Sequence, residues 1–357
     1  MNAIGAAEWL KFHLQLLSNS DLNRINSIST DTCPTMFAMH DILRESPELR
    51  HVFFIPCDSH GLQLLCKDLL TIPRFSLTHK KAQIIVKAFK KAPLQYAHLR
   101  EFQHQIYNQN YTLILSVITQ WGTQYRLISS LLRSKDALRR YAEVHKVKDL
   151  GHDAFEYICD NAFWAELEIL HEILKPIDEK LKMSESSKSH LGHVMNRWND
   201  IVDHLHRKAM AIPELIDFLE QSDDDITGTK GAFHRRYNRQ VTTIHTVAYF
   251  LMPENRQVQI PVVYERPIYN FFRQYTNSQT EYETICEEFQ AFRSQQAPFE
   301  SIHVCWDHIQ KPKVFWSHQG SYTSMIGTLA KHIFSTPVNS VASERAFSIQ
   351  NLIHMKL

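Results

Sequence analysis

The spacing of apolar residues predicts alternating helices and strands over the first part of the chain. A helix is expected over residues 6–17, a short strand over 24–30, and a second helix from Pro34 onward. Residues 51–55 form an unbroken apolar run that suits a strand buried on both faces, and a third helix is expected over 59–70. The first helix is expected to carry these residues along one side: Trp9, Leu10, His13, Leu14 and Leu17. This order of elements predicts a parallel sheet with helices packed against it.

The rest of the chain is expected to be mainly helical. Residues 111–119 are β-like, and the helical pattern over 162–177 is expected to close at Pro176. Residues 222–231 are rich in Asp, Gly and Thr and predict a flexible loop, whereas 298–317 are expected to be irregular. Later helices are expected over residues 241–251, 268–275, 280–292 and 324–333.

Composition narrows the functional classes. The chain has 357 residues, of which 44% are hydrophobic and 22% charged, and it contains no apolar run of 18 residues that would suggest a membrane span. Its first residues have neither a basic start nor an apolar stretch, so they do not predict a secretory signal. Six scattered cysteines without C-x-x-C pairs indicate a reduced, intracellular chain. The strand–helix junctions lack a Gly-rich phosphate loop, which argues against a dinucleotide or P-loop fold.

The charge is unevenly distributed although its sum is only +1. Residues 74–148 contain fourteen Lys and Arg against three Asp and Glu, whereas residues 149–188 contain ten acids and four bases. A basic segment of this kind can form a phosphate-binding face within a neutral protein, although a pair of solvated helix faces is the simpler interpretation because such asymmetry is common. The candidate DNA-binding residues of the basic segment are Lys87, Lys90, Lys91 and Arg126.

Asp31 stands where the first predicted strand ends. The carboxyl ends of strands in α/β sheets gather ligands, and a carboxylate there is a natural ligand for Mg²⁺. The alternative is that Asp31 caps the helix that starts near Pro34.

Cys57 and His60 follow the second predicted strand directly. Such a pair could supply half of a zinc site, but no second pair at suitable spacing completes it. A buried cysteine and a capping histidine are the simpler interpretation, because one helical turn does not by itself join a nucleophile to its base.

Two further residues are candidates for chemistry. Trp121 follows the β-like run inside the basic segment, where it would either belong to the core or stack on an exposed base. Glu344 lies near the end of the chain, and Val341 three residues earlier does not complete a capping box. Asp31 and Glu344 together are compatible with a two-metal phosphodiester site, which needs at least three carboxylates to balance two dications.

Five motifs, in order, give the chain a family resemblance. S-T-D-T-C-P-T-M from Ser29 resembles the second catalytic aspartate motif of hAT (hobo/Activator-type) transposases, and P-C-D-S-H-G-L-Q-L is similar to their C-x-x-H-x-L-N-L segment. T-Q-W-G-T-Q-Y from Thr119 resembles T-R-W-x-S-x-Y, with Gln120 in place of the usual arginine. The stretch from Trp164 to Pro176 resembles W-x-x-L-x-x-L-x-x-x-L-x-P. T-P-V-N-S-V-A-S-E-R-A-F-S, from Thr336 to Ser348, is similar to the family's C-terminal dimerisation segment.

The resemblance implies an α-rich α/β chain with an RNase H-like fold interrupted by a large helical insertion. It implies a core over residues 1–120, an insertion over 121–300 and a return to the core with the dimerisation segment over 301–357. By this resemblance, Asp31 and Glu344 correspond to the family's second and third metal-binding acids, and the implied cofactor is Mg²⁺ or Mn²⁺. It also places Cys57 and His60 near the active site and Trp121 against DNA. Nuclear location, transposon-end DNA and a homo-oligomer are implied in the same way.

The family's first aspartate lies on a strand upstream of the helix matched by residues 6–17, and this sequence has no counterpart to it. The expectation is therefore an N-terminally truncated core with an exposed sheet edge that does not cut DNA by itself. Three hypotheses stay open: a transposase-derived protein that binds DNA and dimerises, a nuclease completed by an upstream exon or less plausibly by Asp21, and a protein-interaction module.

Overall fold

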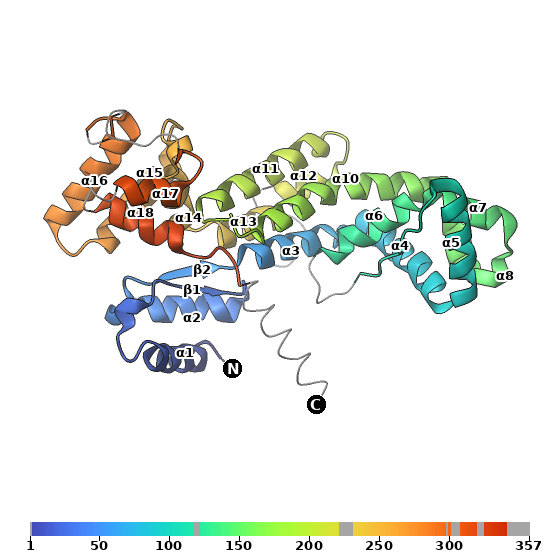
Figure 1. Cartoon of the computed structure of the whole chain (residues 1–357), viewed down its shortest axis with the longest axis horizontal. Coiled ribbons are helices and arrows are strands. Elements are labelled where there is room, and N and C mark those ends of the chain that lie inside the picture. The colour runs from blue at the N-terminus through green and yellow to red at the C-terminus, as the bar shows by residue number, and fades with distance from the viewer. Residues whose placement is uncertain are drawn as a thin grey trace. The chain divides into compact units, whose positions relative to one another are not determined.

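The chain is divided by its internal contacts into two units. A computed structural model describes residues 2–116, 122–220, 231–297, 299–300, 308–319 and 325–340. Unit 1 comprises residues 1–61, 183–200 and 235–357, and unit 2 comprises residues 62–182 and 201–234. The described residues are rich in helix and include a two-stranded parallel sheet (Figure 1). The three-part division expected from the family resemblance stays a prediction.

The N-terminal part of unit 1 follows the order of elements predicted from the sequence. Its elements are α1 (Ala3–Leu17), β1 (Ser27–Thr30), α2 (Pro34–Arg44) and β2 (Phe53–Pro56), with short 3₁₀ turns at Leu22–Arg24 and Pro47–Leu49. The strands pair in parallel, so that Ser27 lies opposite Phe53 and Thr30 opposite Pro56. The parallel pairing expected from the strand–helix–strand order is confirmed for these two strands.

The two faces of β2 bury different neighbours because successive side chains of a strand point to opposite sides. Phe54 belongs to the apolar core formed with α1 and α2, and its ring lies 5.2 Å from that of His40. Phe53 stacks instead on Phe271 of α15 (Val262–Tyr275), at 6.2 Å between ring centroids. β2 is therefore buried on both faces, as its unbroken apolar run predicts.

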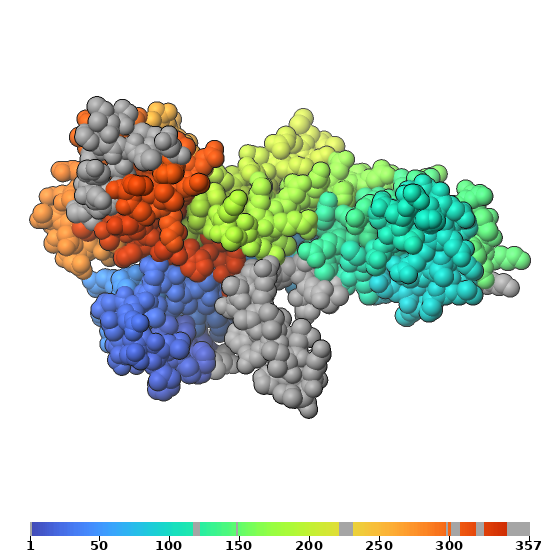
Figure 2. Space-filling model, in the orientation of Figure 1, coloured from blue at the N-terminus to red at the C-terminus, as the bar shows by residue number. Residues whose placement is uncertain are grey.

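The buried side of α1 differs from the one expected. The helix packs on α2 through Ala6, Ala7 and Leu14. The two alanines have small side chains, which allow the helices to approach closely. Trp9 is 54% exposed and Leu17 is 77% exposed, so the apolar side that was expected from the sequence is not buried along its whole length. Apolar residues occur all around this helix, so the periodicity of its sequence alone could not identify the buried face. Figure 2 shows α1 at the surface of the molecule.

Helices form the remainder of unit 1. Their bounds are α13 (Ala232–Gln240), α14 (Thr243–Phe250), the 3₁₀ turn Pro253–Asn255, α15, α16 (Gln279–Ser294), α17 (Pro312–Gln319) and α18 (Ile326–Ser335). The ring of Trp316 on α17 is fully buried, and its Nε1 donates to the Leu251 carbonyl at 2.9 Å. The expected irregular stretch therefore contains a helix over residues 312–319, which begins at a proline, a residue favoured in the first turn.

Unit 2 is built from helices packed around Trp164 and its apolar neighbours. Its bounds are α4 (Pro73–Lys91), α5 (Pro93–Tyr107), α6 (Thr123–Arg133), α7 (Lys135–Val144), α8 (Val147–Leu150), α9 (His152–Cys159), α10 (Asn161–Ser184) and α12 (Glu214–Leu219). Two further helices are α3 (Asp58–Leu69) and α11 (Gly192–Ala209); both have residues in each unit, as do α10 and α13. Trp164 is buried and donates to the Ile158 carbonyl at 2.8 Å.

Helix α10 does not close at Pro176 but continues to Ser184. A proline within a helix removes the hydrogen bond to the carbonyl four residues earlier, which here belongs to Glu172. His204 Nε2 lies 3.1 Å from that carbonyl oxygen and donates to it. The helix therefore continues because a neighbouring helix satisfies the carbonyl that the proline leaves free.

The β-like run is not a strand over its described part, residues 111–116. Side chains of the surrounding helices bind its backbone instead: Leu113 N donates to the Tyr96 hydroxyl at 2.9 Å, and Ile114 N donates to Ser130 Oγ at 3.0 Å. Helix side chains thus bind backbone N–H groups that a neighbouring strand would otherwise pair. None of the described helices is both long and apolar enough to cross a membrane.

Candidate functional site

The carboxyl ends of β1 and β2 bring together residues that are distant in the sequence. Asp31 follows β1 directly, and its side chain is 53% exposed. His60, in the first turn of α3, places Nδ1 at 3.5 Å from Asp31 Oδ1. Asp31 does not cap α2, because Cys33 occupies the N-cap position. The carboxylate is thus left accessible beside an imidazole.

Cys57 occupies the position after β2 and is fully buried. Its N–H donates to the Thr30 carbonyl at 2.8 Å, which extends the strand pairing by one residue. Its Sγ accepts hydrogen bonds from the backbone N–H and the hydroxyl of Ser340, both at 3.4 Å. Burial raises the pKa of the thiol, so the group stays protonated and is suited neither to nucleophilic attack nor to thiolate ligation of zinc. This agrees with the interpretation of Cys57 as a buried cysteine.

Asp58 is the residue at this edge that sequence reasoning missed. It is completely buried, and Arg197 of α11 pairs with its Oδ2 through Nε at 2.8 Å and Nη2 at 2.6 Å. Trp198 Nε1 donates to Oδ1 at 2.9 Å, and the Asp58 N–H donates to the Val338 carbonyl at 3.0 Å. The carboxylate thereby holds α11, and the backbone N–H of the same residue holds the chain that leaves α18. The sequence carried no signal for this role, because the partners lie some 140 and 280 residues away.

A close approach at Gly61 completes the packing behind this edge. A Cβ at residue 61 would lie 2.2 Å from Gln240 Oε1 and 3.2 Å from the Trp198 ring, so a side chain there would displace a neighbour. The Gln240 amide is buried and donates to the Pro56 carbonyl at 2.9 Å. The glycine therefore allows Gln240 to satisfy the last carbonyl of β2.

The chain after α18 returns to the same edge. Asn26, just before β1, donates from its amide to the Thr336 hydroxyl at 2.9 Å and to the His332 carbonyl at 3.1 Å. Ser340 then lies against Cys57, as described above. Glu344 follows four residues later and lies outside the described residues, as does the rest of the S-E-R-A-F-S motif.

The candidate DNA-binding residues lie in unit 2. Lys87, Lys90 and Lys91 are exposed near the end of α4, and Arg126 is exposed on α6, which packs against α4. Trp121 lies outside the described residues.

A cavity of about 530 Å³ adjoins Arg126. Arg133 and Lys182 also line it, together with Tyr125 and His171, whose rings stack at 4.8 Å. Three cations beside two stacked rings form a surface that suits a phosphate backbone and an unpaired base.

Comparison with known proteins gives no family. No protein-family model matches the chain, and no curated protein matches it either. Its site is therefore interpreted from its own residues.

The acids at the sheet edge differ in their capacity to bind a metal ion. Among the described residues, no group of three or more His, Cys, Asp or Glu side chains could hold one. Asp58 is unsuited because Arg197 and Trp198 already occupy both of its oxygens. Asp31 has an accessible carboxylate on a rigid strand end and fits as a single oxygen ligand for a hard divalent ion.

Proposed function

We propose that this chain derives from a hAT-type DNA transposase, with an RNase H-like core, and that Asp31 and Glu344 are two of its metal-binding acids. The observation that carries the proposal is the meeting of three separate motifs at one sheet edge. Asp31 and His60 lie side by side there, and Ser340 packs on Cys57. Residues from three parts of the sequence thus converge where ligands bind in α/β sheets.

Chain geometry supports the assignment of Glu344 to this edge. Four residues of fully extended chain span at most about 14 Å. Since Ser340 contacts Cys57, a carboxylate four residues later has the reach to approach the exposed side of Asp31. Carboxylates within about 10 Å of each other can be bridged by a pair of metal ions.

The cofactor in this proposal is Mg²⁺ or Mn²⁺, which would supply charge neutralisation for phosphodiester chemistry. Asp31 would hold the ion, and Asp58 would keep the strand ends and α11 in place without touching it. His60 would orient the Asp31 carboxylate through the 3.5 Å contact.

The proposed partner is DNA, which implies a nuclear location and, through the C-terminal segment, a homo-oligomer. The basic surface of unit 2 supports this, because Arg126 and the α4 lysines are exposed and can bind the phosphate groups of DNA. The family resemblance assigns two of the three acids that cleavage needs to these 357 residues, so we propose binding without cleavage for this polypeptide. A DNA-binding or dimerisation module derived from a transposase is the second candidate, favoured because no group of three or more possible metal ligands is found among the described residues.

The metal site can be tested with Mn²⁺. We expect the wild-type chain to bind Mn²⁺ weakly, and Asp31→Asn or Glu344→Gln to weaken binding about tenfold or more, because each removes a charged oxygen ligand. Electron paramagnetic resonance of free Mn²⁺ measures this, and incubation with a pre-nicked DNA hairpin tests cleavage in the same samples.

Glu8→Gln is the matched control, since it removes an exposed carboxylate from α1 in the same unit. Equal Mn²⁺ affinity for Asp31→Asn and Glu8→Gln would refute the metal role of Asp31. Cleavage of the hairpin that is lost in Asp31→Asn would support the metal site but refute binding without cleavage.

The DNA surface can be tested through the salt dependence of binding. For Lys90→Ala/Lys91→Ala we expect weaker DNA binding and a slope of log K against log [salt] that is smaller by about 1.8, because each phosphate contact contributes about 0.9. Fluorescence anisotropy of a labelled duplex at several salt concentrations gives the slope.

Lys311→Ala/Lys313→Ala serves as the control, because it removes two exposed lysines from unit 1. The same change in slope for both pairs would mean that the α4 lysines are not a specific DNA contact. If the wild-type chain shows no salt-sensitive binding, the protein-interaction module is the better interpretation.

A further inference from the structure

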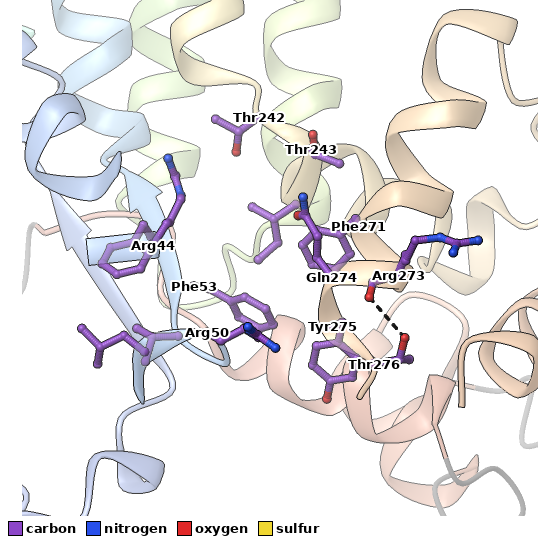
Figure 3. Close-up of a pocket in the computed structure, with 14 residues that line it drawn as sticks. Arg44, Arg50, Phe53, Thr242, Thr243, Phe271, Arg273, Gln274, Tyr275 and Thr276 are labelled. Atoms are coloured by element: carbon purple, nitrogen blue, oxygen red, sulfur yellow. Dashed lines mark hydrogen bonds between the residues drawn. The ribbon is translucent and has the colours of Figure 1, made fainter. Parts of the chain in front are cut away.

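A second cavity, which lies in unit 1, has the chemistry of an anion-binding site. It measures about 640 Å³ and lies between the start of β2 and the helices α14 and α15 (Figure 3). Among the described residues that line it, none is acidic, while arginines, aromatic rings, hydroxyls and an amide all contribute. Its volume lies in the range of small-ligand sites, about 300–1,000 Å³. Such a cavity favours a ligand that combines negative charge with an apolar body.

The positive charge comes mainly from Arg50. Its guanidinium lies beside Phe53 and faces Tyr275 in Figure 3. No acidic side chain within the described ranges lies at ion-pair distance from it. A guanidinium in this position can offer two parallel N–H groups to a phosphate.

Arg44 adds a second cation from the last turn of α2. It lies over the Phe54 ring, 5.6 Å from its centroid, and pairs with exposed Asp41 at 2.7 Å. An exposed pair of this kind is worth about 1 kcal/mol or less, so Arg44 can turn to a ligand at small cost.

Arg273 lines the cavity but does not direct its charge into it. Its guanidinium lies 4.3 Å from the centroid of Tyr282 and points away from Arg50 in Figure 3. Its carbonyl accepts a hydrogen bond from the Thr276 hydroxyl at 3.4 Å. Arg273 is therefore a natural control for Arg50.

The apolar part of the cavity is aromatic. Phe53 and Phe271 stack with 30° between their planes, and Phe271 is only partly buried, so an exposed ring edge and face remain for a ligand. The Gln274 amide lies beside Phe271 in Figure 3 and can donate and accept hydrogen bonds. The Tyr275 hydroxyl instead contacts His332 Nδ1 at 3.4 Å. An aromatic surface next to amide groups suits a flat heterocycle.

We propose that this cavity binds a nucleoside phosphate, with the phosphate on Arg50 and Arg44 and the base against Phe271. The same chemistry is present in a free nucleotide and in one unit of a single-stranded nucleic acid. The cavity uses none of the residues that define the Asp31 edge or the α4 lysines, so the two proposals stand or fall separately.

Isothermal titration calorimetry with dTMP, the dinucleotide pTpT and inorganic phosphate tests the proposal. The wild-type chain is expected to bind dTMP at least about tenfold more tightly than inorganic phosphate, because the base adds stacking. Arg50→Gln should weaken dTMP binding about tenfold or more through the loss of a charge-assisted hydrogen-bonded pair, whereas Arg273→Gln should stay within about twofold.

Each outcome decides the proposal. Equal affinity for dTMP and pTpT would identify a free nucleotide as the ligand of the cavity. An affinity for pTpT about tenfold higher would identify one unit of a single-stranded nucleic acid as the ligand. Binding of phosphate as tight as dTMP, equal losses in Arg50→Gln and Arg273→Gln, or no binding of any of the three ligands overturns it. Since Arg50 is exposed, Arg50→Gln is expected to fold, and its circular dichroism spectrum verifies this. Lys90→Ala/Lys91→Ala should leave dTMP binding unchanged, which separates this site from the DNA surface.

Discussion

Asp58→Ala is expected to lower the free energy of unfolding by about 3–5 kcal/mol. The substitution leaves the Arg197 guanidinium, which is 5% exposed in the native chain, without its counter-charge, and it leaves Trp198 Nε1 without an acceptor. A buried charge without a partner costs several kcal/mol, a large fraction of the 5–15 kcal/mol that stabilises a typical domain. Urea denaturation followed by far-ultraviolet circular dichroism measures the loss.

Asp41→Ala provides the matched control, because it breaks an aspartate–arginine pair of similar length on the exposed side of the same unit. That pair is expected to contribute about 1 kcal/mol or less. Arg197→Met added to Asp58→Ala should recover part of the stability, since it removes the isolated charge. Similar losses for Asp58→Ala and Asp41→Ala would show that the buried pair is not a stabilising element.

Acidification from pH 7.5 to 5 is expected to destabilise unit 1, with about 4 kcal/mol of the loss arising from the buried His40 and His245. His190 and His193 add to this loss, because burial lowers the pKa of His190 to about 3 and that of His193 to about 4. Burial lowers the pKa of His40 and of His245 from 6.5 to about 4, with Arg44 adding to the effect at His40 and Arg197 at His245. Between these values the unfolded chain binds protons that the folded chain does not, so stability falls as pH falls through 6.5. At pH 5 each group contributes about 2 kcal/mol, and below about pH 4 the loss levels off.

Denaturation curves at several pH values test this expectation. His40→Phe and His245→Phe should each reduce the loss between pH 7.5 and 5 by about 2 kcal/mol, because each removes one titrating group. His152→Ala should leave it unchanged, since that side chain is 78% exposed. A wild-type loss that persists unaltered in both phenylalanine variants would mean that other groups control the acid response.

The sequence predicts the elements around the sheet edge well, because local patterns determine them. The run around Phe54 is apolar and short, Asp31 ends a strand, and Pro34 opens a helix; all three positions follow from neighbours within a few residues. The parallel pairing also follows, since a helix joins the two strands.

Features that depend on distant residues could not be predicted in this way. His204 binds the carbonyl that Pro176 leaves free in α10. Residues 111–116 do not form a strand, and Tyr96 and Ser130 bind their backbone instead. The burial of Asp58 needs Arg197 from a helix 139 residues later. In each case a hydrogen bond to a distant residue overrides the structure that the local sequence favours. No pattern in the neighbouring sequence predicts which distant residue forms that bond.

The burial of the tryptophans gives each unit its own optical reporter. Trp164 is enclosed in unit 2, and Trp198 and Trp316 are enclosed in unit 1, whereas Trp9 on α1 is 54% exposed. A variant that keeps only Trp164 should emit at short wavelength and shift to the red when unit 2 melts, with little quenching by acrylamide before that point. In a variant that keeps only Trp9, acrylamide should readily quench the fluorescence of the native state. The fluorescence of this variant will therefore change when a partner covers α1.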